Sequence, residues 1–192
     1  MPAIHSVAVF CGSSSGSNPA FAAAARDLGR GLAESGMRLV YGGGRVGLMG
    51  AVADAMLQAG GEILGVIPEF LTRREVAHTA VDLTVTDSMH SRKQRMFSEA
   101  DAFVSLPGGL GTLDETIEII TWRQLGLHQK PIVLCDIAGS AAALGAAIDA
   151  AIENGFASPR VRDLFQVVSG VPALLDCLRN LPHSTSAPVD RL

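Results

Sequence analysis

A glycine-rich turn near the middle of the chain has the composition of an anion-binding site. Residues 107–112 read Pro-Gly-Gly-Leu-Gly-Thr, between an apolar run at 102–106 that predicts a buried strand and an amphipathic segment at 113–127 that predicts a helix. Glycines let a ligand come close to the backbone. The start of a helix directs free N–H groups and the positive end of its dipole into such a turn. The pattern therefore predicts a phosphate site at residues 108–112.

The same stretch also fits a purely structural pattern. Thr112 and Glu115 have the spacing of a capping box, in which the threonine caps the helix and the glutamate reaches back to the N-cap amide. On spacing alone, Glu115 is either a helix cap or a functional carboxylate. Three glycines within four residues favour a ligand, because an ordinary strand-to-helix turn needs one at most.

Two adjacent cations, Arg92 and Lys93, precede this turn in a segment that predicts a helix. At 100° per residue, Lys93 falls at the centre of the apolar face and Arg92 at its edge. That face comprises Met89, Met96, Phe97 and Ala100. A cation on a buried face is costly unless it meets an anion. The two side chains therefore either reach water or a structural carboxylate, or contact a phosphate or substrate at the end of the next strand.

The elements that must position these residues alternate regularly along the chain. Strands are predicted at 4–11, 37–41, 62–67, 81–85, 102–106, 131–135 and 165–168, and helices at 18–36, 47–59, 87–100, 113–127, 139–154 and 171–181. This alternation predicts an α/β fold, a single-domain Rossmann-like doubly wound parallel sheet with helices on both faces. The domain should span residues 1–181, and residues 182–192, rich in Pro, Ser and Thr, should form a disordered tail.

Ligands of such folds bind beyond the carboxyl ends of the strands, where three small-residue turns fall at 12–17, 42–47 and 108–112. The second turn matches the Gly-x-Gly-x-x-Gly dinucleotide fingerprint, but that fingerprint normally occupies the first strand–helix turn. A mononucleotide pocket fits this turn equally well. The chain has no Gly-Lys pair, which excludes a P-loop, and neither of its two lysines has a context suited to a pyridoxal Schiff base.

Composition excludes several other classes. A net charge of −4 and a pI of about 5.7 argue against a nucleic-acid polymer or an anionic membrane as partner. Neither a signal-peptide pattern nor a long uncharged apolar run is present, and the three cysteines lack metal-ligand spacing. We expect a cytoplasmic protein with reduced thiols and no metal centre.

The helix predicted at 113–127 is apolar on two sides. One side, with Leu113, Ile117 and Ile120, suits packing on the sheet. The other, with Ile119, Trp122 and Leu125, suits a buried position or a subunit contact. A contact at Trp122 would place Glu115 near a dimer interface.

Taken together, these motifs resemble the Lonely-guy (LOG) family of cytokinin-activating phosphoribohydrolases, often mislabelled lysine decarboxylases. The family signature Pro-Gly-Gly-x-Gly-Thr-x-x-Glu is complete at 107–115. An Arg-Lys pair stands upstream at 92–93, Tyr-Gly-Gly-Gly at 41–44 and Thr-Trp-x-Gln-Leu-Gly at 121–126. The likeness runs from about residue 4 to residue 180. One departure is Ser91, where many members carry glutamate.

The resemblance implies hydrolysis of the N-glycosidic bond of a nucleoside 5′-monophosphate, without a cofactor or metal, by a protein that is commonly a homodimer. It implies Arg92 and Glu115 as the catalytic pair. The remaining substrate-binding residues that it implies are Glu75, Lys93, Gly108, Gly109, Leu110, Gly111, Thr112 and Thr121, with the phosphate on Gly109, Gly111 and Thr112. Glu75 falls in a region, 71–80, whose length varies within the family.

This chemistry suits the residues. Cleavage passes through an oxocarbenium-like state whose positive charge Glu115 could stabilise, or Glu115 could act as base toward water. Arg92 could bind phosphate or assist departure of the base. Adenine-type monophosphates, including N6-substituted ones, are the expected substrates. A broader nucleoside monophosphate nucleosidase, a nucleotide or cofactor carrier without turnover, and an NAD-linked oxidoreductase are the alternatives.

Overall fold

A computed structural model of the protein describes residues 4–73 and 76–181, and the tail predicted at 182–192 lies outside them. The strands are β1 (Ser6–Phe10), β2 (Arg38–Tyr41), β3 (Ile63–Pro68), β4 (Asp82–Thr86), β5 (Ala102–Ser105), β6 (Ile132–Asp136) and β7 (Gln166–Ser169). The helices are α1 (Pro19–Glu34), α2 (Gly47–Gln58), α3 (Met89–Glu99), α4 (Leu110–Gln124), α5 (Ala142–Glu153) and α6 (Gly170–Asn180). Two short 3₁₀ helices are η1 (Glu69–Leu71) and η2 (Pro159–Leu164).

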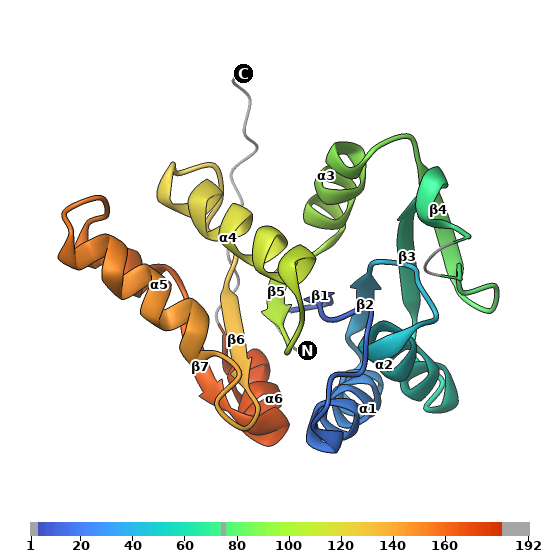
Figure 1. The fold of residues 1–192 in the computed structure, drawn as a ribbon. Coiled ribbons are helices and arrows are strands. Elements are labelled where there is room, and N and C mark those ends of the chain that lie inside the picture. The colour runs from blue at the N-terminus through green and yellow to red at the C-terminus, as the bar shows by residue number, and fades with distance from the viewer. Residues whose placement is uncertain (1–3, 74–75, 182–192) are drawn as a thin grey trace.

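The strands form one sheet in the order β4-β3-β2-β1-β5-β6-β7, and every pairing is parallel (Figure 1). The chain builds outward from β1 to β4 and then returns to the other side of β1 with β5. The order therefore reverses between β1 and β5, which is where a doubly wound sheet opens its ligand crevice. The predicted fold class is confirmed.

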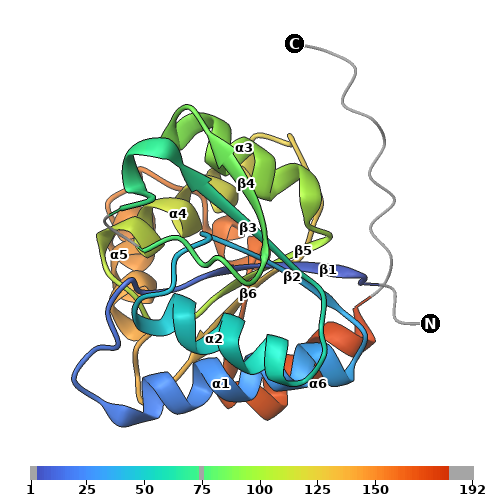
Figure 2. The same ribbon diagram turned by 90° about the vertical axis from the view of Figure 1, so that its right-hand side faces the viewer.

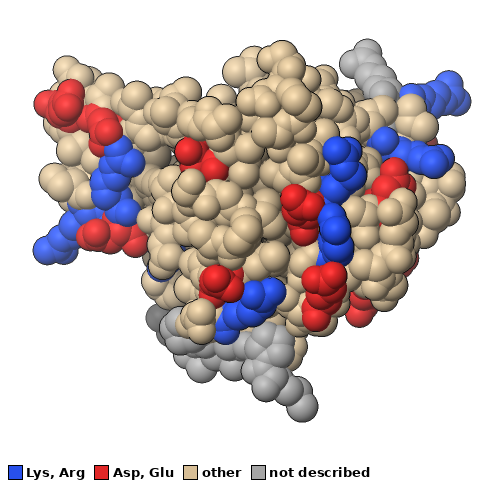
Figure 3. Space-filling view, turned by 90° about the horizontal axis from the view of Figure 1, so that it is seen from below, with Lys and Arg blue, Asp and Glu red and all other residues tan. Residues whose placement is uncertain are grey.

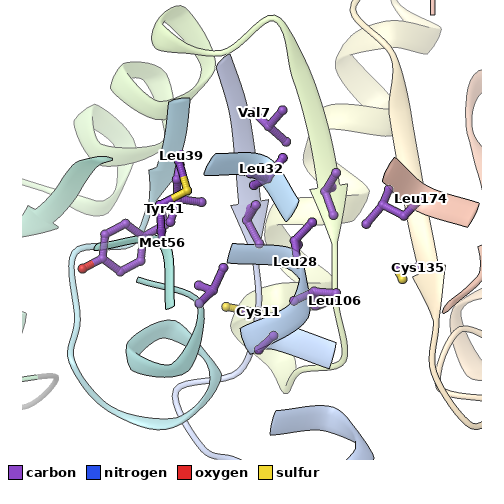
Figure 4. Packing of buried hydrophobic residues seen from close by; sticks show 14 of the residues in the cluster. Val7, Cys11, Leu28, Leu32, Leu39, Tyr41, Met56, Leu106, Cys135 and Leu174 are labelled. Atoms are coloured by element: carbon purple, nitrogen blue, oxygen red, sulfur yellow. The ribbon is translucent and has the colours of Figure 1, made fainter. Parts of the chain in front are cut away.

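The helices cover both faces of the sheet (Figure 2). Val7 and Val9 of β1 belong to the core shared with α1, α2 and α6. Ala8 and Phe10 alternate with them and join the core shared with α3, α4 and α5. Figure 4 shows the first of these cores, in which Leu28 and Leu174 pack over the strands. Burial on both faces explains why the strands read as apolar runs rather than alternating ones.

Local signals set the start of α1 as predicted. The side chain of Asn18 accepts a hydrogen bond from the amide of Ala20 at 3.0 Å, and Pro19 is the first helical residue. None of the helices in residues 4–73 and 76–181 has the length and apolarity needed to cross a membrane. On the face of Figure 3, basic and acidic side chains lie beside one another around a broad area that carries neither.

The start of α4 differs from the prediction. The helix begins at Leu110, with Gly109 as its N-cap, so Thr112 is already inside the first turn and the capping-box alternative for Thr112 and Glu115 is not observed. Gly108 permits the early start, because a Cβ there would lie 2.1 Å from the Thr112 hydroxyl. Glu115 therefore does not have the position of a capping-box residue, which its spacing from Thr112 had suggested.

The faces of α4 were also assigned wrongly in part. Leu113 and Ile117, expected on the sheet, are 38% and 46% exposed, whereas Ile119 and Ile120 are buried. Thr116 occupies the sheet side instead. Its hydroxyl donates to the carbonyl of Thr112 at 2.6 Å, so a polar residue can be buried there without an unsatisfied group.

His128 is buried between the rings of Phe97 and Phe103 and provides a pH-dependent term in stability. Burial lowers the pKa of His128, and its Nδ1 accepts the amide of Lys130 at 3.1 Å, which requires the neutral ring. A group with a lowered folded pKa contributes stability above its unfolded pKa of about 6.5 and loses it as the pH falls below that value. The wild type should therefore lose up to about 1.4 kcal/mol per pH unit from this group below pH 6.5.

Urea unfolding of the wild type and His128→Gln between pH 8 and pH 5 tests this. The gap in unfolding free energy between the two proteins should narrow as the pH falls, because only the wild type loses the His128 contribution. Parallel curves would contradict it.

Candidate active site

Loops from three neighbouring strands meet at the crevice between β1 and β5. The amide of Gly12, after β1, donates to the carbonyl of Pro107, after β5, at 3.1 Å, and the amide of Leu48 in α2 donates to the carbonyl of Gly12 at 3.0 Å. These bonds hold the turns predicted at 12–17, 42–47 and 108–112 against one another. A pocket of about 210 Å³ opens here. It is lined by Val9, Cys11, Ser13, Gly42, Met49, Leu71, Met89, Arg92, Met96, Gly109, Leu110, Gly111, Thr112 and Glu115.

The glycines of the turn at 107–112 are needed for two different reasons. Gly108 is required by packing, because a Cβ there would collide with Thr112 and approach the amide of Gly12. Gly109 and Gly111 border open space, since a Cβ at either position would meet nothing within 4 Å. The first backbone amides of α4, at Leu110, Gly111 and Thr112, have no acceptor within the helix. Open glycines beside these amides form a cradle that can accept an anion such as a phosphate.

Gly111→Ala is expected to raise the stability of the protein while weakening its binding of substrate at this cradle. Replacing a helical glycine by alanine should stabilise the protein by about 0.5–1 kcal/mol. The methyl group would enter the space left for the phosphate, so we expect KM for a nucleoside monophosphate to rise about tenfold, close to 1.4 kcal/mol of lost binding.

Thermal unfolding and steady-state kinetics measure the two effects. Gly145→Ala in α5 is the matched control, because its nearest neighbour would lie 3.7 Å away and it lies outside the pocket. The control should gain stability with KM unchanged. An unchanged KM in Gly111→Ala would contradict the cradle.

Arg92 is buried, with 4% of its surface exposed, and its position is fixed from the sheet side. Nε donates to the carbonyl of Val66 at 3.1 Å, and Nη2 donates to the carbonyl of Gly42 at 3.2 Å. A Cβ on Gly42 would lie 2.1 Å from Nη2, so glycine is the residue that leaves room for this guanidinium. The sequence placed Lys93 at the centre of the buried face and Arg92 at its edge, and the structure reverses that order.

Glu115 lies on the other wall of the pocket, 9% exposed, in the second turn of α4. Its other side faces a small cavity of about 10 Å³, whose lining includes the aromatic residues Phe10, Phe103 and Trp122 and the charged residues Lys93 and Glu118. Burial between this cavity and the pocket shields the carboxylate from bulk water. Charge–charge interactions are stronger in such surroundings than in water.

Lys93 contacts acidic residues rather than the pocket. Nζ lies 3.2 Å from Oδ2 of Asp114 and 3.0 Å from Oε2 of Glu118, both on α4. Desolvation acts to lower the pKa of Lys93, but the hydrogen bonds and charges of Glu118 and Asp114 outweigh it, so the pKa is raised. The structure therefore shows Lys93 paired with protein carboxylates, and its predicted contact with the substrate stays a prediction.

Thr121, which was also predicted to bind substrate, lies apart from the pocket residues. Thr121 is on the exposed face of α4, where its hydroxyl donates to the carbonyl of Ile117 at 2.9 Å. Thr121 lies nine positions after Thr112, or about 13 Å along the helix axis. Glu75 lies outside the described residues. Leu110, which was predicted to bind substrate, lines the pocket, and 85% of its surface is exposed.

Sequence reasoning missed the apolar and sulfur-containing lining of the pocket. Met49 and Leu71 come from α2 and η1, and nothing in their local patterns marks them, whereas Met89 was placed on the apolar face of its helix but not in the site. Ser13 and Gly42 could have been found, because they stand in the turns that follow β1 and β2. Residues without a local signal come together at the pocket only when the chain folds.

Packing explains two of the three glycines of the fingerprint at 42–47. A Cβ on Gly42 would lie 2.1 Å from Nη2 of Arg92, and one on Gly47 would lie 2.4 Å from the backbone of Ser13 and Ser14. The same turn also holds the segment after η1, because the amide of His78 donates to the carbonyl of Gly43 at 2.9 Å. These glycines serve contacts within the protein and need no dinucleotide to account for them.

Comparisons with known proteins agree with this geometry. Residues 49–178 match the family model described as "Possible lysine decarboxylase". The chain is 45% identical over 176 residues to cytokinin riboside 5′-monophosphate phosphoribohydrolase LOG7 of Arabidopsis thaliana, covering 91% of this chain and 80% of that protein. It is 43% identical over 173 residues to LOG2 of the same plant, covering 90% and 81%.

A solved structure with a similar fold is the molybdenum cofactor binding protein of Rippkaea orientalis. The TM-score is 0.69 at 23% identity, covering 91% of this chain and 94% of that one. At this identity the likeness concerns the fold alone. The family model and the identities above 40% decide the family: the chain belongs to the Lonely-guy family of cytokinin riboside 5′-monophosphate phosphoribohydrolases.

Proposed function

We propose that this protein hydrolyses the N-glycosidic bond of adenosine 5′-monophosphates, including N6-substituted cytokinin nucleotides, to free base and ribose 5-phosphate. The observation that carries the proposal is one pocket that combines the open N-terminus of α4 with a buried arginine and a buried glutamate, Arg92 and Glu115. The names of the Arabidopsis relatives support the same activity.

Three groups would contribute to the reaction: the amides at the start of α4, Glu115 and Arg92. The amides at Gly109–Thr112 would hold the phosphate, and that binding energy would orient the ribose in the pocket. As the bond from C1′ to the base nitrogen breaks, positive charge grows on the ribose. Glu115 can stabilise this charge or take the proton of the attacking water. Water then supplies the hydroxyl of C1′, and its proton ends on the departing base.

Arg92 is preorganised for its part. Its two bonds to main-chain carbonyls hold the guanidinium plane while Nη1 remains beside Met89 at the pocket wall. A fixed cation in a water-poor pocket needs no reorganisation when charge moves during the reaction. It can bind the phosphate or assist departure of the base.

Chromatographic detection of free base from AMP and isopentenyladenosine monophosphate tests the proposal. We expect base release from both, and the ratio of kcat/KM values distinguishes a cytokinin-activating enzyme from a broader nucleosidase. Nucleotide binding without release of base from either substrate would refute hydrolysis of these substrates and indicate a carrier.

We also propose that the protein works in the cytoplasm as a homodimer joined through the outer face of α4. Leu110, Leu113 and Ile117 of this helix are 85%, 38% and 46% exposed, and its C-cap residue Leu125 is 67% exposed. Large apolar residues gathered on one helix face are typical of an interaction site. If two copies of α4 pack antiparallel about Ile117, Leu113 of one meets Thr121 of the other. This arrangement would bring Thr121 close to the partner's pocket.

Ile117→Glu should convert the dimer to a monomer, because it would bury two charges at the symmetry axis. Light scattering coupled to size-exclusion chromatography gives the mass, and base release by the variant should fall with it. Phe156→Glu is the control, since Phe156 is 88% exposed but lies outside α4. An Ile117→Glu variant that stays dimeric would place the interface elsewhere.

A further inference from the structure

The anion cradle beside the pocket is built from two parts that belong to different elements. Its first glycines, at 108 and 109, stand in the turn after β5, and its amides, at 110–112, belong to the first turn of α4. Glycines give such a turn little stiffness of its own. Gly109 is the N-cap of α4 and has no side chain that could bind the first amides. The position of these amides relative to β5 therefore depends on contacts made elsewhere.

Thr116, in the second turn of α4, makes one such contact with the last residue of β5. Thr116 is fully buried. Its Oγ1 lies 2.6 Å from the carbonyl oxygen of Thr112 and 2.9 Å from Oγ of Ser105. A hydroxyl can donate one hydrogen bond and accept another, so both bonds can form at once. Together they link the end of β5 to Thr112, the last residue of the cradle.

Packing holds the cradle less firmly on its β6 side. A cavity of about 50 Å³ lies there, and its lining includes Ser105, Gly108, Thr112, Leu134 and Ser140. Thr112 therefore stands between this cavity and the pocket. Protein interiors are normally close-packed, and side chains that do not fill a space cannot fix the groups that border it. The hydrogen bonds of Thr116 act at the place where packing is incomplete.

Stability alone does not explain a threonine at this buried position. On burial, the Thr116 hydroxyl exchanges hydrogen bonds to water for bonds to Ser105 and Thr112, so the net gain in free energy is small. Two apolar side chains of similar shape could replace the two hydroxyls with little change in stability. A hydrogen bond differs from apolar packing in its narrow range of distance and angle. The link is therefore suited to fixing one position of α4.

We propose that Thr116 is a positioning residue for the phosphate of the nucleotide, acting through Ser105 and the carbonyl of Thr112. Thr116 does not contact the ligand, because it is fully buried. It holds the amides at 110–112 in place relative to β5, so that the cradle is formed before a phosphate arrives. This role rests on the proposed function, in which those amides bind the phosphate.

Thr116→Val tests the proposal, because valine is close to threonine in size but lacks the hydroxyl. We expect Kd for ribose 5-phosphate and KM for AMP to rise about tenfold with kcat within about threefold, because a less preorganised cradle weakens binding in the ground state and the transition state alike. Thr116→Ser keeps the hydroxyl, and both constants should stay within about threefold of the wild type. Calorimetric titration gives Kd, and base release gives KM and kcat.

The double variant Ser105→Ala/Thr116→Val distinguishes positioning from stability. Thr116→Val alone leaves the Ser105 hydroxyl without this partner and should lower the midpoint of thermal unfolding. Removal of both hydroxyls should bring the midpoint back toward that of the wild type, while Kd for ribose 5-phosphate stays raised. Ser98→Ala in α3 is the control, since its hydroxyl also donates to a carbonyl of its own helix, that of Arg95, and lies outside the pocket. Its constants should match the wild type.

The outcomes distinguish this proposal from the proposed function. If the wild type binds ribose 5-phosphate but releases no base from any monophosphate, the hydrolase function fails, and Kd of the variants still decides the role of Thr116. If Thr116→Val or the double variant binds ribose 5-phosphate as tightly as the wild type, the positioning role is overturned. The double variant decides alone if Thr116→Val does not fold. A wild type that binds neither ribose 5-phosphate nor AMP would overturn the cradle and the role of Thr116 with it.

Discussion

Glu115→Gln is expected to lower kcat for base release about 10³-fold, within the range that general-base and electrostatic stabilisation contribute. The amide keeps the size of the side chain but can neither carry negative charge opposite the ribose nor accept a proton from water. Because α4 begins at Leu110 and is capped at Gly109, the change removes no helix cap. We therefore expect the unfolding midpoint to stay close to that of the wild type.

Base release from AMP, thermal unfolding and nucleotide affinity should be measured on the same preparation. A folded variant that binds AMP and retains its kcat would exclude Glu115 from the chemistry. A variant that unfolds would show that the buried carboxylate is needed for the fold. In that case Glu115→Asp is the variant to measure, because it keeps the buried negative charge but moves it away from the ribose. A folded Glu115→Asp protein with a lowered kcat would assign Glu115 to the chemistry.

Gly42→Ala is the second change with a large expected effect, although Gly42 carries no reactive group. Its new Cβ would lie 2.1 Å from Nη2 of Arg92 and 2.9 Å from the sulfur of Met49. The guanidinium must leave the carbonyl of Gly42, and Arg92 would no longer face the substrate. Misplacement by about 1 Å can cost about a hundredfold in rate, and we expect a loss of kcat of that order.

Arg92→Lys should give a similar loss, because one ammonium group cannot reach both the carbonyls of Val66 and Gly42 in the way that the fork of arginine does. The double variant Gly42→Ala/Arg92→Lys should be little worse than either single change, since both act on one contact. Additive losses would mean that Gly42 acts independently of Arg92. Gly145→Ala again serves as the control for a glycine-to-alanine change away from the pocket.

The exposed face of α4 changes how two of the predicted residues are understood. Thr121 has no place in the pocket of its own chain, yet it shares its helix face with Leu113 and Ile117. A substrate role for Thr121 is therefore tied to the proposed dimer. If the protein is not a dimer through this face, Thr121 has no route to a substrate. The Ile117→Glu variant therefore tests both the dimer and the role of Thr121.

Local patterns in the sequence determined the order and the class of the elements. The start of α1 follows from Asn18 and Pro19 alone, because a cap and a first-turn proline act within one helical turn. The parallel sheet follows from apolar strands that alternate with helices. The position of the glycine-rich turn at 107–112 follows from its glycines and from the helix that comes after it. These features depend on neighbours a few residues away, and sequence carries that information directly.

Tertiary structure decided what each functional residue contacts. The acceptors that fix Arg92 are the carbonyls of Val66 on β3 and of Gly42 in the turn after β2, 26 and 50 residues before it. Lys93 meets carboxylates on α4, and its 21-residue separation from Asp114 gives no local signal. The capping-box spacing at Thr112 was misleading because Gly108 lets α4 start early. A periodic pattern shows which residues share a face of a helix. It does not show which face packs on the sheet, because that depends on whether buried polar groups such as the Thr116 hydroxyl find hydrogen-bond partners there.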